Sequence, residues 1–199
     1  MDILLALCLG VALSAACGFR VFIPPFALSL AANYGNLDLA SQLDWLESPV
    51  SVIALGIATI VEILAYYIPV VDNVLDTIEI PTAIAFGTIL TGANLGEVDP
   101  LLQWTLAVIA GGGTAGIIES ATSITRLAST GVTGGMGNFL LATMEALSAA
   151  VLSILALTVP FLAIALVIGL VIFAIGKIAQ FLPRLIAHKK GKARSDFDS

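Results

Sequence analysis

Five ionisable residues lie within or at the edge of long apolar stretches, and these are the residues best placed to do chemistry. They are Arg20, Glu62, Glu119, Arg126 and Glu145. At the centre of a bilayer each would cost about 2.5–3.5 kcal/mol, so such side chains normally face the interior of a helix bundle and pair with one another. Three acids and two bases allow two pairs and leave one acid over. We therefore predict that these side chains line a polar path for a small ion or solute.

The same charges have a second interpretation, in which buried ion pairs only fix the packing of helices or lie near an interface where they snorkel. Convergence on one water-accessible cavity would favour a path, and separate pairs would favour packing. An enzyme is the least favoured class, because a nucleophile beside an activated base is not found. His188 lies in a basic tail, Cys8 and Cys17 lie in an apolar segment, and the common nucleotide, protease and hydrolase motifs are absent from the sequence. We expect no catalytic residue, no metal site and no cofactor.

The composition is typical of a protein that lies in a lipid bilayer. Hydrophobic residues make up 59% of the 199 residues, charged residues only 11%, and the mean hydropathy is +1.06. An ordinary soluble domain has about 25% charged residues, so this chain has too few to coat a core. Lipid admits only helices or closed barrels, and the apolar runs are continuous rather than alternating. The sequence therefore predicts an all-α, polytopic membrane bundle.

Six apolar segments of about the length that a span requires can be marked. They run from about Ile3 to Ala32, Val50 to Val71, Ile80 to Leu95, Leu101 to Ala128, Asn138 to Val159 and Pro160 to Leu182. We expect residues 1–185 to form one transmembrane domain and residues 186–199 a short basic tail. The turn at Thr158–Pro160 is apolar, so the last two spans should form a tight hairpin.

Two of these segments contain helix breakers. The first holds Gly18, Pro24 and Pro25, so we predict two half-length helices that meet near them. The fourth holds Gly111, Gly112 and Gly113, which weaken a helix and also let a neighbouring helix come close. Each half of the chain thus combines a glycine-interrupted span bearing Arg with a span bearing Glu. This pattern suggests a 3+3 inverted repeat, an arrangement typical of transporters.

Two connections have a marked composition. After Pro69 the chain carries Asp72, Asn73 and Asp76, from which we predict a short interfacial helix, capped by Asp72 or Asn73, at the cytoplasmic mouth of the path. The second connection is a glycine-rich loop containing Thr133, Gly134 and Gly135, which ends at Asn138.

The distribution of basic residues predicts the orientation. Six of the eight Lys and Arg residues lie between Lys177 and Arg194, and such a segment normally stays cytoplasmic. With six spans, both termini would be cytoplasmic in the cell (inner) membrane. The partners we expect are the lipid bilayer and the transported ion or solute. Nucleic acid is not expected, because the tail is short and ends in Asp196 and Asp198. A single chain makes a narrow path, so a homodimer is plausible.

Four stretches resemble the bacterial membrane family called domain of unknown function 4126. They are Gly18-Phe19-Arg20 with Pro24 and Pro25; Trp45-Leu46 with Ser48-Pro49; Glu62 with Ile68-Pro69, Val71-Asp72 and Asp76; and Ser129-Thr130 with Thr133-Gly134-Gly135, Gly137-Asn138 and Glu145. The chain departs from the family pattern at Tyr66-Tyr67. The resemblance implies an Asp-Lys pair at this place, before the Ile-Pro, in many members of the family. The resemblance implies a polytopic helical membrane protein and does not choose between the functions above.

Overall fold

Every regular element in the part of the chain that the structure describes is a helix, as predicted. The computed structural model describes residues 3–35, 37, 39–96 and 98–195. Its elements are α1 (Ile3–Cys17), α2 (Ile23–Tyr34), the 3₁₀ helix η1 (Ser41–Glu47), α3 (Pro49–Ala65), α4 (Pro69–Asn94), α5 (Pro100–Leu106), the π-helix η2 (Ala107–Gly112), α6 (Gly113–Thr133), α7 (Asn138–Thr158) and α8 (Pro160–Ser195). The tight hairpin predicted at Thr158–Pro160 is present between α7 and α8.

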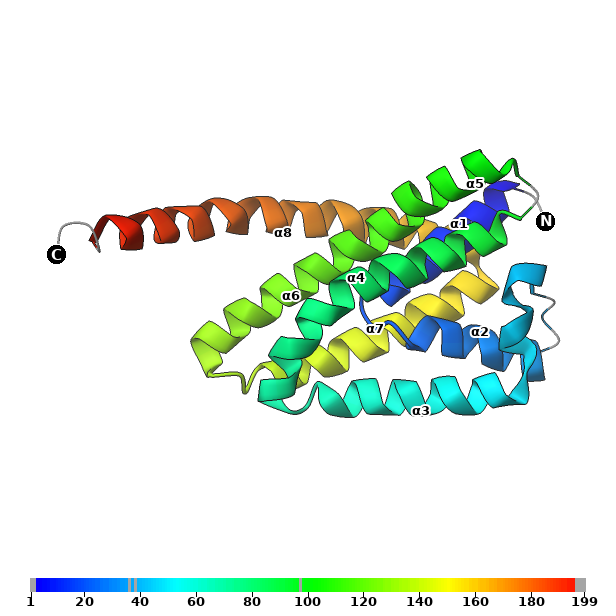
Figure 1. Ribbon diagram of the computed structural model, residues 1–199, viewed down its shortest axis with the longest axis horizontal. Coiled ribbons are helices and arrows are strands. Elements are labelled where there is room, and N and C mark those ends of the chain that lie inside the picture. The colour runs from blue at the N-terminus through cyan, green and yellow to red at the C-terminus, as the bar shows by residue number, and fades with distance from the viewer. Residues whose placement is uncertain (1–2, 36, 38, 97, 196–199) are drawn as a thin grey trace.

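The first apolar segment is broken, as predicted, between Cys17 and Ile23. Figure 1 shows α1 running inward from one end of the bundle and α2 returning towards the same end, so the two form a re-entrant pair. Pro24 and Pro25 lie in the first turn of α2, where a missing N–H group costs nothing. Gly18 lies against α6, where an added Cβ would be 2.6 Å from the carbonyl oxygen of Ala115. This close contact fixes the tip of the pair inside the bundle.

Because α1 and α2 turn back, the predicted count of six spans is not confirmed. Among the described residues, four helices are long and apolar enough to cross a membrane: Val74–Asn94, Pro100–Thr133, Asn138–Thr158 and Pro160–Gln180. A fifth is formed if η1 and α3, which meet at a bend of 78°, are taken as one span. The prediction that both termini are cytoplasmic is not confirmed either. The start of α1 and the end of α8 lie at opposite ends of the long axis (Figure 1), whereas an even number of spans would have put them on one side.

The glycines of the fourth segment do not break the chain's path, which corrects the prediction of a helix break at Gly111, Gly112 and Gly113. The helix continues from Pro100 to Thr133 through the π-helical turn η2. These glycines instead allow close packing on α4, since a Cβ on Gly111 would be 2.6 Å from the carbonyl oxygen of Gly87. The α1–α2 break therefore has no counterpart here, and the 3+3 inverted repeat is not confirmed.

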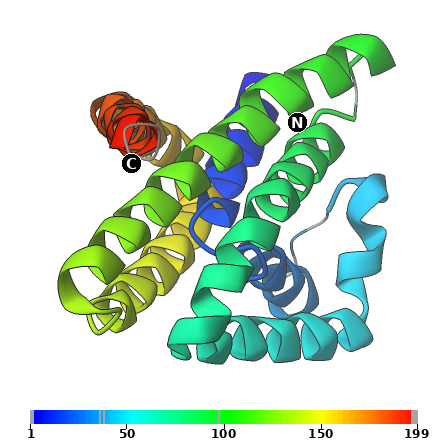
Figure 2. The same ribbon diagram turned by 60° about the vertical axis from the view of Figure 1, so that its left-hand side comes forward.

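The short interfacial helix predicted after Pro69 is also absent, because α4 runs without interruption from Pro69 to Asn94 and includes Pro81. Figure 2 shows α3 lying along one edge of the bundle and α8, seen nearly end-on, standing apart from it over its outer part. The glycine-rich loop is confirmed. Gly134 and Gly135 have φ values of 63° and 93°, which favour glycine, and they end α6 just before α7 begins.

Candidate functional site

Charged side chains from five parts of the chain meet inside the bundle, and we call this group the buried charge cluster. Its members are Arg20 from the α1–α2 break, Glu62 from α3 with Tyr66 just after it, Asp76 and Glu79 from α4, Glu119 and Arg126 from α6, and Glu145 from α7. None of these residues is more than 9% exposed. All five charges singled out from the sequence are therefore buried in one region, although their transport role stays a prediction.

Glu145 holds the cluster together, because its carboxylate binds both arginines. Its Oε2 lies 3.0 Å from Nη2 of Arg20 and also pairs with Nη2 of Arg126, while its Oε1 accepts a hydrogen bond of 3.3 Å from Nε of Arg126. The Nη1 group of Arg126 pairs with Asp76. Arg126 lies seven residues before the end of α6, and Glu145 and Asp76 lie seven residues into α7 and α4. At 1.5 Å per residue, all three side chains therefore start about 10 Å from the same end of the bundle.

Tyr66 separates the two positive charges. Its ring centroid lies 3.6 Å from Cζ of Arg20 and 4.0 Å from Cζ of Arg126, so both guanidinium groups stack on the ring. Cation–π contact of this kind is worth about 2 kcal/mol or more when it is desolvated. The Tyr66 hydroxyl lies 3.4 Å from Oδ1 of Asp76. The ring is therefore a spacer that lets two arginines approach one carboxylate.

Glu62 contacts the tip of the re-entrant pair through the backbone. Its Oε1 accepts a 2.7 Å hydrogen bond from the N–H of Val21, and its Oε2 accepts a 3.2 Å bond from the N–H of Phe22. Its carboxyl group is also in side-chain hydrogen-bonding contact with that of Glu79. Nη1 of Arg20 lies 3.8 Å from Oε2 of Glu79. Glu62 thus joins α3 to the tip and to α4.

Glu119 is the deepest acid and is only indirectly tied to the others. It is fully buried, and its Oε1 accepts a 3.0 Å hydrogen bond from Ser123 of the same helix. Its Oε2 is buried without a hydrogen-bond partner, as are Oε2 of Glu79 and both Nε and Nη1 of Arg20. Such a partly satisfied network is costly in a medium of low dielectric constant.

Acids outnumber bases in the cluster. Asp76 and the four glutamates provide five carboxyl groups, against the two guanidinium groups of Arg20 and Arg126. Three uncompensated buried charges would cost several kcal/mol each, so some of the carboxyl groups must be neutral. No group of three or more His, Cys, Asp or Glu residues among those described is arranged to hold a metal ion. Protonation of some of these carboxyl groups would provide this neutrality.

Sequence reasoning placed Asp76 at the mouth of the path and missed Tyr66 and Glu79. In the structure Asp76 lies within the cluster, whereas the side chains of Asp72 and Asn73 are outside the described residues. The missed residues did carry a signal. Tyr66 follows Glu62 by four residues and Glu79 follows Asp76 by three, and both spacings put the two side chains on one helical face. Glu79 lies just outside the apolar segment predicted to begin at Ile80, and this boundary hid the spacing.

The glycine-rich loop closes the nearby end of the bundle. Asn138 is buried and donates a 2.9 Å hydrogen bond to Oγ1 of Thr130. Thr133 Oγ1 accepts a 2.9 Å bond from the N–H of Gly137. These bonds tie the end of α6 to the start of α7, so the loop supports the depth at which Arg126 and Glu145 meet.

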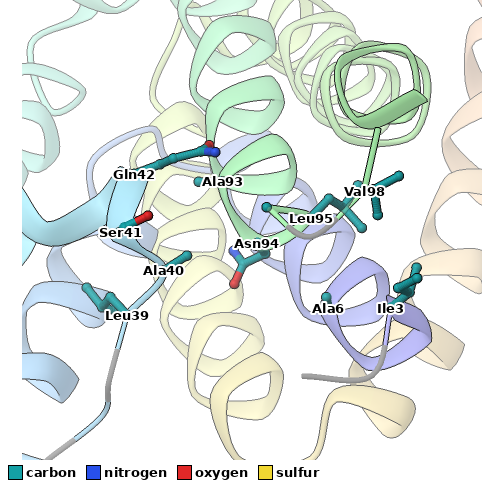
Figure 3. A pocket seen from close by; sticks show the side chains of 11 residues that line it. Ile3, Ala6, Leu39, Ala40, Ser41, Gln42, Ala93, Asn94, Leu95 and Val98 are labelled. Atoms are coloured by element: carbon teal, nitrogen blue, oxygen red, sulfur yellow. The ribbon is translucent and has the colours of Figure 1, made fainter. Parts of the chain in front are cut away.

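A pocket of about 330 Å³ opens at the other end of the bundle (Figure 3). It lies between the start of α1, the end of α4 and the chain around η1, and its polar lining includes Ser41, Gln42 and Asn94. Asn94 is 15 residues beyond Glu79 on α4, which corresponds to about 22 Å. The pocket is therefore far from the cluster, and the other cavities that the structure describes are not lined by cluster residues either. A water-accessible cavity at the charges, the observation that would favour a path, is not among these cavities.

An apolar layer lies beside the cluster on the side of this pocket. Val21, Ala83 and Ala115 form it, with the rings of Phe22 and Phe86 packed against them at a centroid distance of 5.8 Å. Val21 and Phe22 directly follow Arg20 in the chain. On α4, Ala83 and Phe86 follow Glu79 by one and two turns, and on α6 Ala115 precedes Glu119 by one turn. The layer therefore separates the charges from the pocket.

These features define a multi-pass helical membrane protein with a buried charge cluster at the tip of a re-entrant pair. The family model described as "Domain of unknown function (DUF4126)" matches residues 7–180, and the chain belongs to this family. The matched range contains the whole cluster and confirms the resemblance that the sequence motifs indicated. No curated protein and no solved structure matches the chain.

Proposed function

We propose that this protein is a small secondary transporter or channel, without enzymatic activity, that moves an ion or solute by means of the carboxyl groups of the buried charge cluster. The excess of acids carries the proposal. Paired charges can serve packing, but five carboxyl groups facing Arg20 and Arg126 exceed what pairing needs. The carboxyl groups in excess of the two guanidinium groups add a desolvation cost in lipid that ion pairing does not offset. A membrane protein gains from such groups when they exchange protons or bind a passing ion.

The arrangement of helices supports a gated path. The cluster lies about 10 Å from one end of the bundle, and the pocket containing Asn94 lies at the other. The apolar layer around Val21 and Phe22 belongs both to the re-entrant tip and to the boundary between the two regions. Broken helices that meet near the middle of the membrane are typical of transporters. A shift of the tip would therefore open the cluster towards the pocket.

We propose a sidedness from the basic residues after Lys177. They favour a cytoplasmic location for the end of α8 in the inner membrane, and hence for the loop between α6 and α7. The pocket and the start of α1 would then face outward. The bilayer and the transported species are the partners that this function needs, and a homodimer would place two such paths side by side.

The alternative is a structural or assembly protein whose ion pairs only fix helix packing. The closed state of the cluster favours it, because Glu145 already binds both arginines and the described cavities lie elsewhere. This alternative predicts lower stability on loss of a charge and no flux in any form of the protein.

Flux measurements in proteoliposomes separate the two. We would measure uptake of H⁺, Na⁺, K⁺ and Cl⁻ after imposing each gradient, with an ionophore to compensate charge. The wild type should show flux of at least one ion, and Glu62→Gln should reduce it at least tenfold. Glu47→Gln is the matched control, because Glu47 is an exposed glutamate on η1 and its loss should leave the flux unchanged. Absence of flux from the wild type, or equal flux in wild type and Glu62→Gln, would sink the proposal.

A further inference from the structure

The start of α2 has an unusual set of free backbone donors. A helix leaves its first N–H groups without partners inside the helix. Here Pro24 and Pro25 carry no N–H group, so the free donors at this end belong to Val21, Phe22 and Ile23. Glu62 accepts two of them, at 2.7 Å and 3.2 Å. The carboxylate of Glu62, which belongs to another helix, therefore accepts hydrogen bonds from two of the three free N–H groups at the re-entrant tip.

This contact depends on the charge of Glu62. An ionised carboxylate accepts hydrogen bonds at both oxygens and is favoured at the positive end of a helix. A protonated carboxyl group has one oxygen occupied by its proton and binds the same two N–H groups more weakly. The tip is thus held when Glu62 is ionised and loosened when it is neutral.

Glu79 provides the partner for the proton. Two carboxyl groups in hydrogen-bonding contact, as Glu62 and Glu79 are, need one proton between them. In the structure Glu62 accepts from the backbone, which places the proton on Glu79. Nη1 of Arg20 and Oε2 of Glu79 are both buried without a hydrogen bond and lie 3.8 Å apart, too far for one. Arg20 is therefore positioned to bind Glu79 once the proton has left it.

We propose that the Glu62–Glu79 pair binds the coupling proton and that Glu62 is a latch which releases the α1–α2 tip when the proton moves onto it. In this step the O–H bond of Glu79 breaks and an O–H bond forms on Glu62. The resulting Glu79 carboxylate pairs with Arg20, and the N–H groups of Val21 and Phe22 lose their charged acceptor. The inference rests on the proposed function for its purpose, since it names the proton as the coupled ion, but its geometry can be tested without transport.

The other charged groups around Glu62 agree with this assignment. Cys17 of α1, Arg20 of the break, Tyr66 just beyond α3 and Glu79 of α4 are its titratable or charged neighbours. Glu119 of α6 acts on Glu79, and Glu145 of α7 acts through Arg20. Arg20 is the only positive charge among these described neighbours, and it contacts both Glu79 and Glu145. Movement of the proton from Glu79 to Glu62 therefore keeps the negative charge beside Arg20.

The chain contains its own reporter for this movement. Cys17 is fully buried, and its Sγ lies 3.8 Å from the carbonyl oxygen of Val21 at the tip. In a Cys8→Ser background, the rate of Cys17 alkylation by N-ethylmaleimide at fixed pH reports tip release in detergent-solubilised full-length protein. Loss of hydrogen bonds to a charged acceptor should raise that rate about tenfold or more in Glu62→Gln. Thr59→Val, which changes a buried residue one turn away on α3, is the matched control and should leave the rate unchanged.

A second variant predicts the opposite effect and keeps the proposal testable if Glu62→Gln does not fold. Glu79→Gln removes the acid that shares its proton with Glu62, and its amide can donate a hydrogen bond to the Glu62 carboxylate, so Glu62 should be protonated only at lower pH and Cys17 should react no faster than in the wild type at any given pH. Rates at each pH are divided by those of the protein unfolded in SDS, which removes the pH dependence of the thiol itself. The wild type should then show faster alkylation in acid, and Glu79→Gln should show the same increase only at a lower pH.

Three outcomes would overturn the latch. They are an unchanged Cys17 rate in Glu62→Gln, an acid response at the same pH as the wild type in Glu79→Gln, or an equal increase at Cys8 in a Cys17→Ser background. The last would indicate general unfolding, because Cys8 lies on the same helix far from the tip. If flux requires Glu62 while Cys17 does not respond, the latch is wrong and the transport function stands. If Cys17 responds but no flux is found, the proton-controlled movement stands and the transport function fails.

Discussion

The two halves of this bundle are held together by opposite means. Around Ser14 the helices touch through small residues. Its hydroxyl oxygen lies 2.6 Å from the carbonyl oxygen of Gly87 and 2.8 Å from Oγ1 of Thr91, and every group finds a partner. Around Glu145 the helices meet through long charged side chains, and several buried atoms have no hydrogen-bond partner. The comparison indicates that the half around Ser14 is rigid and holds the helices in place. In the half around Glu145, the charged side chains can exchange partners.

Removal of a cation should have the largest effect on the cluster half. Arg126→Met leaves Asp76 and Glu145 without their shared partner, and breaking a buried pair in this way costs about 3–5 kcal/mol. We expect a large loss of the free energy of unfolding, measured by SDS titration in mixed micelles. Lys177→Met removes a cation from the exposed side of α8 and should change it little. If Arg126→Met and Lys177→Met were equally stable, the ion pairs of Arg126 would not hold the cluster half together.

An added methyl group should have a smaller but clear effect on the rigid half. Gly111→Ala would place its Cβ 2.6 Å from the carbonyl oxygen of Gly87, and overpacking of this kind costs about 1–3 kcal/mol. Gly131→Ala, on the same continuous helix, meets nothing within 4 Å and should be neutral or slightly stabilising. Thermal unfolding of the two variants in detergent tests this prediction, and a Gly111→Ala protein as stable as Gly131→Ala would contradict the close packing.

The smallest effect is expected at the Tyr66 hydroxyl. Tyr66→Phe keeps the ring on which Arg20 and Arg126 stack and removes only the hydroxyl, which lies 3.4 Å from Oδ1 of Asp76 and is also in hydrogen-bonding contact with Glu79. The free energy of unfolding should therefore change by less than about 1 kcal/mol, while Tyr66→Leu should cost more because both cation–π contacts are lost. Equal stability of these two variants would mean that the ring is not the spacer between the arginines.

Much of this arrangement was predictable from the sequence, because charges in an apolar chain have few places to go. Arg20, Glu62, Glu119, Arg126 and Glu145 were expected to face the interior, and they do. The break near Gly18 and the hairpin at Pro160 followed from backbone chemistry. These features depend on single residues and their immediate neighbours, which the sequence shows directly.

The direction that the chain takes after a break was not predictable. Whether α2 continues across the membrane or turns back depends on contacts such as that of Gly18 with Ala115, which are about one hundred residues apart in sequence. The same limit applies to Gly111, where glycine could break a helix or admit a neighbour, and only the position of α4 decides. The same limit applies to the site, because Glu79 lies between two predicted apolar segments and joins the cluster only through the continuous helix α4.

The re-entrant pair has a consequence for how this protein is made. The neighbours on which α1 packs include α4, α7 and α8, all of which leave the ribosome later. A helix of 15 residues is too short to be a stable span by itself. During synthesis, α1 therefore cannot reach its final packing, and its assembly in the bilayer cannot be completed, until α4, α7 and α8 have been made.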